Sequence, residues 1–313
     1  MTTLNAPASA PNRGGTAASS AEPRTNAFTA FMDKHHFILR RLHSLSGIFP
    51  VGLFIIAHLF TNAQMAWNDA GDTFQHEVNF IHSIPALVFI EISLWVGIGF
   101  HALLGLYYTF SGRSNVRAYS YSANWRYTLQ RISGIVALVF IFFHIATLRW
   151  RWDILGWYTP FYASAYDAPG LAEAGWSPAI ADAVINAPMS GPLTAYALQF
   201  STWVALLYLV GTLFTIYHWS NGLWTAAITW GVTTSAAAMK RWGYACLGLF
   251  VALFFFFAAA FWGSLVYDFD ELRPEQKVAF MAIVEDGGWV FDEPIPDEAA
   301  LAAHLAENPV AAH

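Results

Sequence analysis

The sequence predicts an all-α membrane protein in which five transmembrane helices form a bundle, and three observations support this prediction. Apolar residues make up 56% of the 313 residues and charged residues only 12%, about half the charged share of a soluble domain. The 14 Trp and 26 Phe agree, because aromatic rings are enriched where a bilayer meets water. Five apolar segments are each long enough to cross a bilayer, which takes about 20 residues.

Residues 1–30 are rich in Ala, Thr, Ser, Asn and Pro without an apolar core. We expect a disordered cytoplasmic arm there, not a signal peptide. The membrane domain is expected over residues 31–267, with an outer loop at 150–194 that packs at the membrane interface. Residues 268–313 are expected to form an acidic, solvated external tail with a short helix near 273–284. The five predicted spans lie near residues 43–66, 84–110, 129–149, 195–219 (or to 230 if the helix continues) and 241–267.

The charge distribution predicts the orientation of these spans. Eleven of the fifteen Lys and Arg residues fall in the N-terminal arm, in the loop 111–131 or in the pair Lys240–Arg241. The positive-inside rule then places the N-terminus in the cytoplasm and the C-terminus outside. The expected location is the cytoplasmic (inner) membrane, with multiple passes.

Four of the eleven histidines lie well inside predicted spans, one on each of the first four: His58, His101, His144 and His218. At about 1.5 Å of rise per residue, His58 lies roughly 25 Å past cytoplasmic Arg41, and His144 shortly precedes the outer end of its span. His101 lies roughly 18 Å from cytoplasmic Arg113, and His218 is near the end of an inward-running span. The sequence therefore predicts an outer pair, His58 with His144, and an inner pair, His101 with His218.

Two opposed imidazoles per iron are the axial ligands of many haems, and binding a metal removes the cost of burying a polar ring. Two matched pairs therefore favour two haem b groups in a haem-binding bundle. A single histidine of this kind can also be a hydrogen-bonded core residue. Zinc is an alternative metal, although histidine pairs without nearby cysteine or acid fit it poorly.

Small residues suggest where a flat ligand could enter. Gly105 and Gly222 follow the inner histidines by four residues, and thus lie on the same helical face. The segments "LHSLSG" at 42–47 and "RISG" at 131–134 would also leave space between helices. Their similarity, and that of "HALLGLY" to "HWSNGLW", suggests that the two halves of the membrane domain are related.

Haem propionates and quinones need cations or hydroxyl groups near the membrane surface. The sequence offers several, each of which could instead be an ordinary interfacial anchor. They are Arg41, His43, Ser44, Arg126 and Arg131 on the inner side and Arg149 and Arg151 on the outer side. Glu91 and Asp69 are possible proton carriers near the outer side, and Glu91 could equally be a satisfied interfacial acid.

The segments "RRLHSLSGIFPVGLFIIAHL", "FHALLGLYYTFSG", "YSYSANWRYTLQRISGI" with "FFHIATLRW", and "YHWSNGLWTAAITWG" carry a resemblance. They resemble the five-helix, di-haem cytochrome b subunit of succinate dehydrogenases and fumarate reductases that have a single large anchor. The resemblance covers most of residues 38–235. It implies that His58 and His144 bind the distal haem and that His101 and His218 bind the proximal one. The long loop, the arm and the acidic tail depart from the compact members of that family.

The single cysteine, Cys246, excludes an iron–sulfur cluster held by this chain alone. By resemblance, a flavoprotein and an iron–sulfur subunit bind its cytoplasmic face, and the haems carry electrons between them and a membrane quinone, with menaquinone more typical than ubiquinone. The chain itself is not expected to oxidise a dicarboxylate, and no nucleic-acid partner is expected. The alternatives are another quinone-reactive di-haem cytochrome b, such as that of a bc complex, and a haem-free anchor or transporter that uses the histidines as a proton path.

Overall fold

The computed structural model describes residues 26–67, 69–150, 152, 177–284, 291–292 and 294–308. Residues up to Leu39 form one compact unit, and Arg40–His313 form the second. Within the described residues the regular structure is entirely helical, which agrees with the predicted fold class. The elements are α1 (Ala27–Ile48), α2 (Val51–Ala63), η1 (Gln64–Ala66), α3 (Asp72–Ser83), α4 (Leu87–Ser111), α5 (Ser122–Leu148), α6 (Pro178–Ile185), α7 (Ser190–Phe200), α8 (Thr202–Thr229), α9 (Ala236–Leu265), α10 (Pro274–Ile283) and α11 (Glu298–Glu307).

The described residues contain five candidate membrane spans, as predicted. They are Ala27–Ala66, which comprises α1, α2 and η1, and the helices α4, α5, α8 and α9. Each is long enough for a bilayer, because about 20 helical residues suffice. The chain is a multi-pass membrane protein.

Two boundaries differ from those predicted. The helix α1 begins at Ala27, inside the expected disordered arm, because the side chain of Asn26 accepts a hydrogen bond from the backbone N–H of Thr29 (2.7 Å) and caps its first turn. The fourth span was expected from residue 195, but Ser201 separates α7 from α8 and caps α8 by accepting from the N–H of Val204 (3.5 Å). The continuation of this span to about residue 230 is confirmed.

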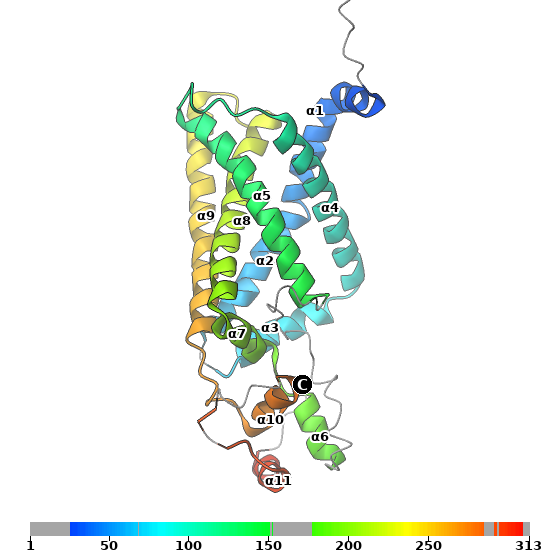
Figure 1. Cartoon of the computed structure of the whole chain (residues 1–313), viewed down its shortest axis with the longest axis vertical. Coiled ribbons are helices and arrows are strands. Elements are labelled where there is room, and N and C mark those ends of the chain that lie inside the picture. Colours follow the sequence, from blue (N-terminus) through cyan, green and yellow to red (C-terminus); the bar gives the residue numbers. More distant parts are fainter. Residues whose placement is uncertain are drawn as a thin grey trace, which may run out of the picture. The chain divides into compact units, whose positions relative to one another are not determined.

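The long helices of the second unit run alongside one another (Figure 1). The helix α5 packs against α8, α8 against α9, and α9 against α2, while α4 contacts α2 and α5 and completes the ring. Only 6% of the most apolar stretch of α4 is buried, against 22% to 33% in the other spans. The helix α4 is therefore the most loosely held member of the ring.

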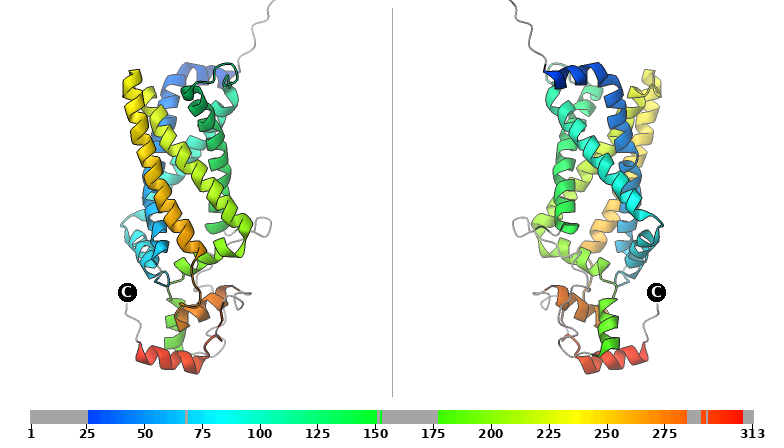
Figure 2. Two further views of the ribbon diagram at one scale, coloured as in Figure 1. Left: turned by 90° about the vertical axis from the view of Figure 1, so that its left-hand side faces the viewer. Right: turned by 90° about the vertical axis from the view of Figure 1, so that its right-hand side faces the viewer.

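Beyond one end of the long helices, the connecting segments form a second core, which we call the extramembrane cluster. Figure 2 shows α6, α10 and α11 gathered at this end. The cluster is made by buried side chains of η1, α3, α6, α7, α10, α11 and the segments beside α10, including Met65, Phe74, Val184, Leu193, Tyr196, Phe269, Phe280, Phe291 and Leu301.

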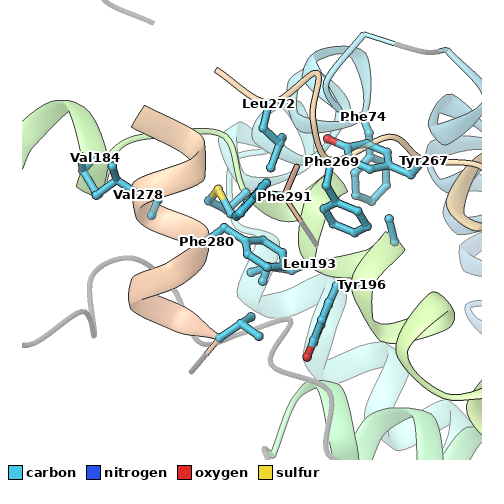
Figure 3. Close-up of a cluster of buried hydrophobic side chains, with 14 of the residues drawn as sticks. Phe74, Val184, Leu193, Tyr196, Tyr267, Phe269, Leu272, Val278, Phe280 and Phe291 are labelled. Atoms are coloured by element: carbon cyan, nitrogen blue, oxygen red, sulfur yellow. The ribbon is translucent and has the colours of Figure 1, made fainter. Parts of the chain in front are cut away.

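Phe280 lies at the centre of the extramembrane cluster, with no exposed surface. Its ring centroid is 5.3 Å from that of Tyr196, 5.4 Å from Phe269 and 5.7 Å from Phe291 (Figure 3). The predicted short helix near 273–284 is present as α10. The prediction of a solvated tail is wrong for this segment, because α10 buries its apolar face against α6 and α7 rather than facing water.

Polar contacts join α10 to segments that are distant in the sequence. The side chain of Gln276 is fully buried and donates from Nε2 to the carbonyl oxygens of Pro188 (2.7 Å) and Ala70 (3.3 Å). Arg273 pairs with Asp72 of α3 at 2.7 Å. Burial opposes the charge of Arg273, but the hydrogen bonds and charges of Asp72 and Glu275 together outweigh burial and raise the pKa of the guanidinium. This end of the protein is therefore a folded layer.

Candidate functional site

The four intramembrane histidines come together as two pairs. The ring centroids of His58 (α2) and His144 (α5) are 5.8 Å apart, and those of His101 (α4) and His218 (α8) are 6.0 Å apart. These are the two pairs that the depths along the helices predict. We call the first the cluster-side pair, because α2 and α5 end near the extramembrane cluster soon after these residues, and the second the opposite-side pair.

The separation within each pair suits one metal atom between two imidazoles. A ring nitrogen lies about 2 Å from a bound metal, so two opposed rings, each about 1 Å from nitrogen to centre, have centroids about 6 Å apart. The described residues contain no group of three or more His, Cys, Asp or Glu side chains that could hold a metal ion. Zinc requires three or four protein ligands, whereas haem iron takes its other four ligands from the porphyrin and needs only two. The donor sets therefore fit haem and not zinc.

Main-chain carbonyl groups orient both rings of the opposite-side pair. Nδ1 of His101 donates to the carbonyl oxygen of His43 at 2.8 Å, and Nδ1 of His218 donates to that of Gln130 at 3.0 Å. The side chain of Gln130 also donates from Nε2 to the carbonyl oxygen of His218 (2.9 Å). A hydrogen on Nδ1 leaves the lone pair on Nε2, which is the arrangement that a metal ligand needs.

Glycines allow these rings to approach the neighbouring helix. A Cβ atom at Gly47 would collide with the ring of His101, and one at Gly134 would lie 2.8 Å from Cε1 of His218. In each half the glycine follows the accepting carbonyl by four residues, at positions 43 and 47 and at 130 and 134. This repeated arrangement supports the relation between the two halves that the sequence suggests.

The glycines that follow the opposite-side histidines contact other groups. A Cβ at Gly105 would lie 3.3 Å from Cε1 of His43, and one at Gly222 would lie 3.3 Å from Nε2 of Gln130. His43 also stacks on His101, with ring centroids 4.0 Å apart and an interplanar angle of 12°. Gly105 thus makes room for His43, a close neighbour of the histidine pair.

Side chains, not carbonyl groups of a neighbouring helix, contact the cluster-side pair. Nδ1 of His144 lies 3.1 Å from the hydroxyl oxygen of Tyr208 on α8. Nδ1 of His58 lies 3.5 Å from the amide nitrogen of Asn62 on its own helix. The sequence analysis missed Tyr208 and Gln130, because only the packing of α5 against α8 brings them to the histidines.

A cavity of about 150 Å³ adjoins the opposite-side pair, and it is smaller than most ligand pockets, which measure about 300–1,000 Å³. It lies between the end of α1 and the helices α2, α4, α5 and α8. The histidines His101 and His218 line it together with His43, Ser44 and Gln130. Its remaining walls are mostly apolar, as in most cofactor sites.

The residues that the sequence offered for an anionic cofactor group on the inner side fall into two sets. His43 and Ser44 line the cavity. Arg41 is close by: its guanidinium lies 5.3 Å above the ring of Trp230. The Nε1 of Trp230 in turn donates to Ser44 Oγ (2.8 Å). Arg131 and Arg126 do not line this cavity.

Arg131 instead donates to the carbonyl oxygens of Thr109 and Gly112 and satisfies the last turn of α4. Arg126 lies 4.6 Å over the ring of Trp224 and lines a different hollow.

Three of the residues offered on the outer side are described, and each of them has a partner. Arg149 pairs with Glu91 at 3.6 Å, and both side chains are about half exposed, so this ion pair stabilises the protein little. Asp69 accepts from the backbone N–H of Thr73 (3.0 Å) and from its hydroxyl group, and so holds the first turn of α3. Arg151 lies outside the described residues.

Membrane-spanning helices that place histidines in pairs at two depths are typical of membrane cytochromes, and comparison with known proteins agrees. The chain is 34% identical over 218 residues to the "Succinate dehydrogenase cytochrome b558 subunit" of Bacillus subtilis (strain 168), which covers 69% of this chain and 91% of that protein. The chain belongs to the family of cytochrome b subunits of succinate dehydrogenase. No protein-family model and no solved structure matches it.

Proposed function

We propose that this chain is the membrane anchor of a succinate:quinone oxidoreductase and carries electrons through two b haems. The observation that carries the proposal is that the four intramembrane histidines form two pairs, and the ring centroids within each pair are about 6 Å apart. His58 and His144 would hold one haem, and His101 and His218 the other. Bound haem supplies one-electron redox chemistry, and two haems at different depths provide stepping points across a bilayer.

The chain's own groups hold the imidazoles in place for this role. The carbonyl groups of His43 and Gln130 fix two rings with Nε2 free, and Tyr208 contacts a third. Because a hydrogen bond from Nδ1 raises the basicity of the other ring nitrogen, these acceptors strengthen metal binding. Around the opposite-side haem, we propose that Arg41, His43 and Ser44 bind the propionates. Arg149 and Arg151 remain proposals for the haem of the cluster-side pair.

The partners follow from the family and from the charge distribution. We propose that a flavoprotein and an iron–sulfur subunit bind the end of the bundle where Lys and Arg concentrate, which would face the cytoplasm. The extramembrane cluster would then lie on the outer side of the cytoplasmic membrane. The electron acceptor or donor in the bilayer would be a quinone, with menaquinone favoured by the resemblance to single-anchor members. Glu91 and Asp69 remain proposals for proton carriers.

The decisive experiment is a haem count on the purified complex. Pyridine haemochrome analysis should give two b haems for each copy of this chain, and a reduced-minus-oxidised spectrum should show that succinate reduces at least one of them. One haem, or none, would contradict the proposal. A haem-free transporter would give none, whereas another di-haem cytochrome would contain haem that succinate does not reduce.

A further inference from the structure

A second hollow, of about 270 Å³, lies between α5, α8 and α9, and we call it the Arg126 hollow. Its walls include Arg126, Tyr217, Ser220, Cys246, Leu247 and Phe250. It shares no lining residue with the cavity of the opposite-side pair. Asn221 stands between the two spaces, because its amide nitrogen donates to Gln130 Oε1 (2.8 Å) and to the carbonyl oxygen of Arg126 (3.3 Å).

The polar groups of the Arg126 hollow lack partners that would match them. Among the described residues, no carboxylate forms an ion pair with Arg126, whose guanidinium lies 4.6 Å from the centroid of the Trp224 ring. Ser220 is 3% exposed, and its hydroxyl group has no hydrogen-bond partner within the part of the chain that the structure describes. Native structures rarely leave a buried hydroxyl unpaired. Both groups therefore point to a ligand that accepts hydrogen bonds.

The rest of the hollow is apolar and continues into the membrane. Cys246, Leu247 and Phe250 lie on one face of α9, at spacings that a helix brings together. Arg126 is in the first turns of α5, close to the end of the bundle where the basic residues concentrate. A cation and hydroxyl groups near the membrane surface, with a hydrocarbon wall below them, suit an anionic amphiphile.

We propose that the Arg126 hollow binds the phosphodiester group of an anionic phospholipid, with one acyl chain along Leu247 and Phe250. The guanidinium fork matches phosphate oxygens, and the hydroxyl groups of Tyr217 and Ser220 can add donors. Basic pockets between transmembrane helices bind such head groups. Among the residues that the structure describes, the lining contains no acid that would pair with the cation of a zwitterionic lipid. A haem propionate would offer similar oxygen atoms, and the experiment below separates the two.

The test reconstitutes the purified complex in bicelles of phosphatidylcholine and phosphatidylglycerol at a ratio of about four to one. Native mass spectrometry then counts the phosphatidylglycerol that remains bound. We expect Arg126→Gln to weaken this binding about tenfold, as the loss of a charge-assisted hydrogen bond would, and Ser220→Ala to weaken it about threefold. Arg241→Gln is the matched control. It also removes one positive charge, but from an exposed position in the first turns of α9, at the end of the bundle where Arg126 lies. This variant should leave lipid binding unchanged.

Three results would overturn the proposal. Equal losses in Arg126→Gln and Arg241→Gln would mean unspecific attraction to charge, and unchanged binding in both hollow variants would mean no site. A lower haem content in Arg126→Gln with unchanged lipid would assign Arg126 to a propionate. If Arg126→Gln does not accumulate, Ser220→Ala decides, since it removes only one hydroxyl group. This test does not depend on the proposed haem function, because the lipid count is independent of it.

Discussion

The two histidine pairs have nearly the same separation but are held in different ways. The opposite-side pair is fixed by carbonyl groups of His43 and Gln130 and by glycines that admit the rings. The cluster-side pair relies on the side chains of Tyr208 and Asn62. A carbonyl group in a helix cannot be removed by substitution, whereas a hydroxyl group can. The comparison teaches that two histidine pairs with similar geometry can be held differently, one by fixed main-chain groups and the other by side chains that substitution can change.

The largest expected effect is the selective loss of one haem. His218→Ala should abolish the low-spin signal of the opposite-side haem and leave that of the cluster-side haem, because ligands to one iron must lie about 4 Å apart. His144→Ala should do the reverse. Low-temperature reduced-minus-oxidised spectra and electron paramagnetic resonance of both variants measure this. If His101→Ala and His58→Ala altered the same spectral component, the two pairs would be wrongly assigned.

An intermediate effect is expected at Gly134. Gly134→Val would place a side chain against the ring of His218, since even a Cβ would lie 2.8 Å from Cε1, and should lower the occupancy of the opposite-side haem several-fold. The matched control is Gly99→Val, because a Cβ at Gly99 has no neighbour within 4 Å. Haem content of the purified variants is the measurement. Equal losses in both variants, or a loss confined to the cluster-side haem, would contradict the role given to Gly134.

The smallest expected effect is at the cluster-side pair. Tyr208→Phe should keep both haems but raise the midpoint potential of the cluster-side haem by roughly 20–60 mV, the equivalent of one ordinary hydrogen bond. The potential should rise because the ring of His144 loses an acceptor that increases its basicity and so favours ferric iron. Redox titration of the two haems measures the shift. A shift confined to the other haem, or a fall in potential, would count against the contact.

Sequence reasoning could predict the spans and the histidine pairs because both depend on local quantities. Hydropathy locates a span, and rise per residue gives the depth of His58 or His218 within it. The prediction failed where tertiary packing decides. Nothing in the apolar run before residue 201 reveals that α7 ends there, and Arg126 looks like any interfacial cation until α8 and α9 enclose it.

The extramembrane core was missed for the same reason. Phe74, Leu193 and Phe280 lie far apart in the sequence, in three segments that share no common pattern. Acidic residues around α10 suggested a solvated tail, yet its buried face is defined by contacts with α6 and α7. A pattern within one segment cannot identify partners in another.

The extramembrane cluster also affects how the chain can assemble. Its core takes side chains from the connection after the first span, from the connection before α8, and from the segments after α9. During synthesis, Phe74 and Leu193 emerge well before Phe280, which fills the centre between them. Until α10 arrives, the apolar faces of α3 and α7 lack the cover that Phe280 and its neighbours give them, and such transiently exposed surface is prone to aggregation. The segments after α9 thus fasten two earlier connections at once, and the layer beside the cluster-side histidines closes only after α9 and α10 have been made.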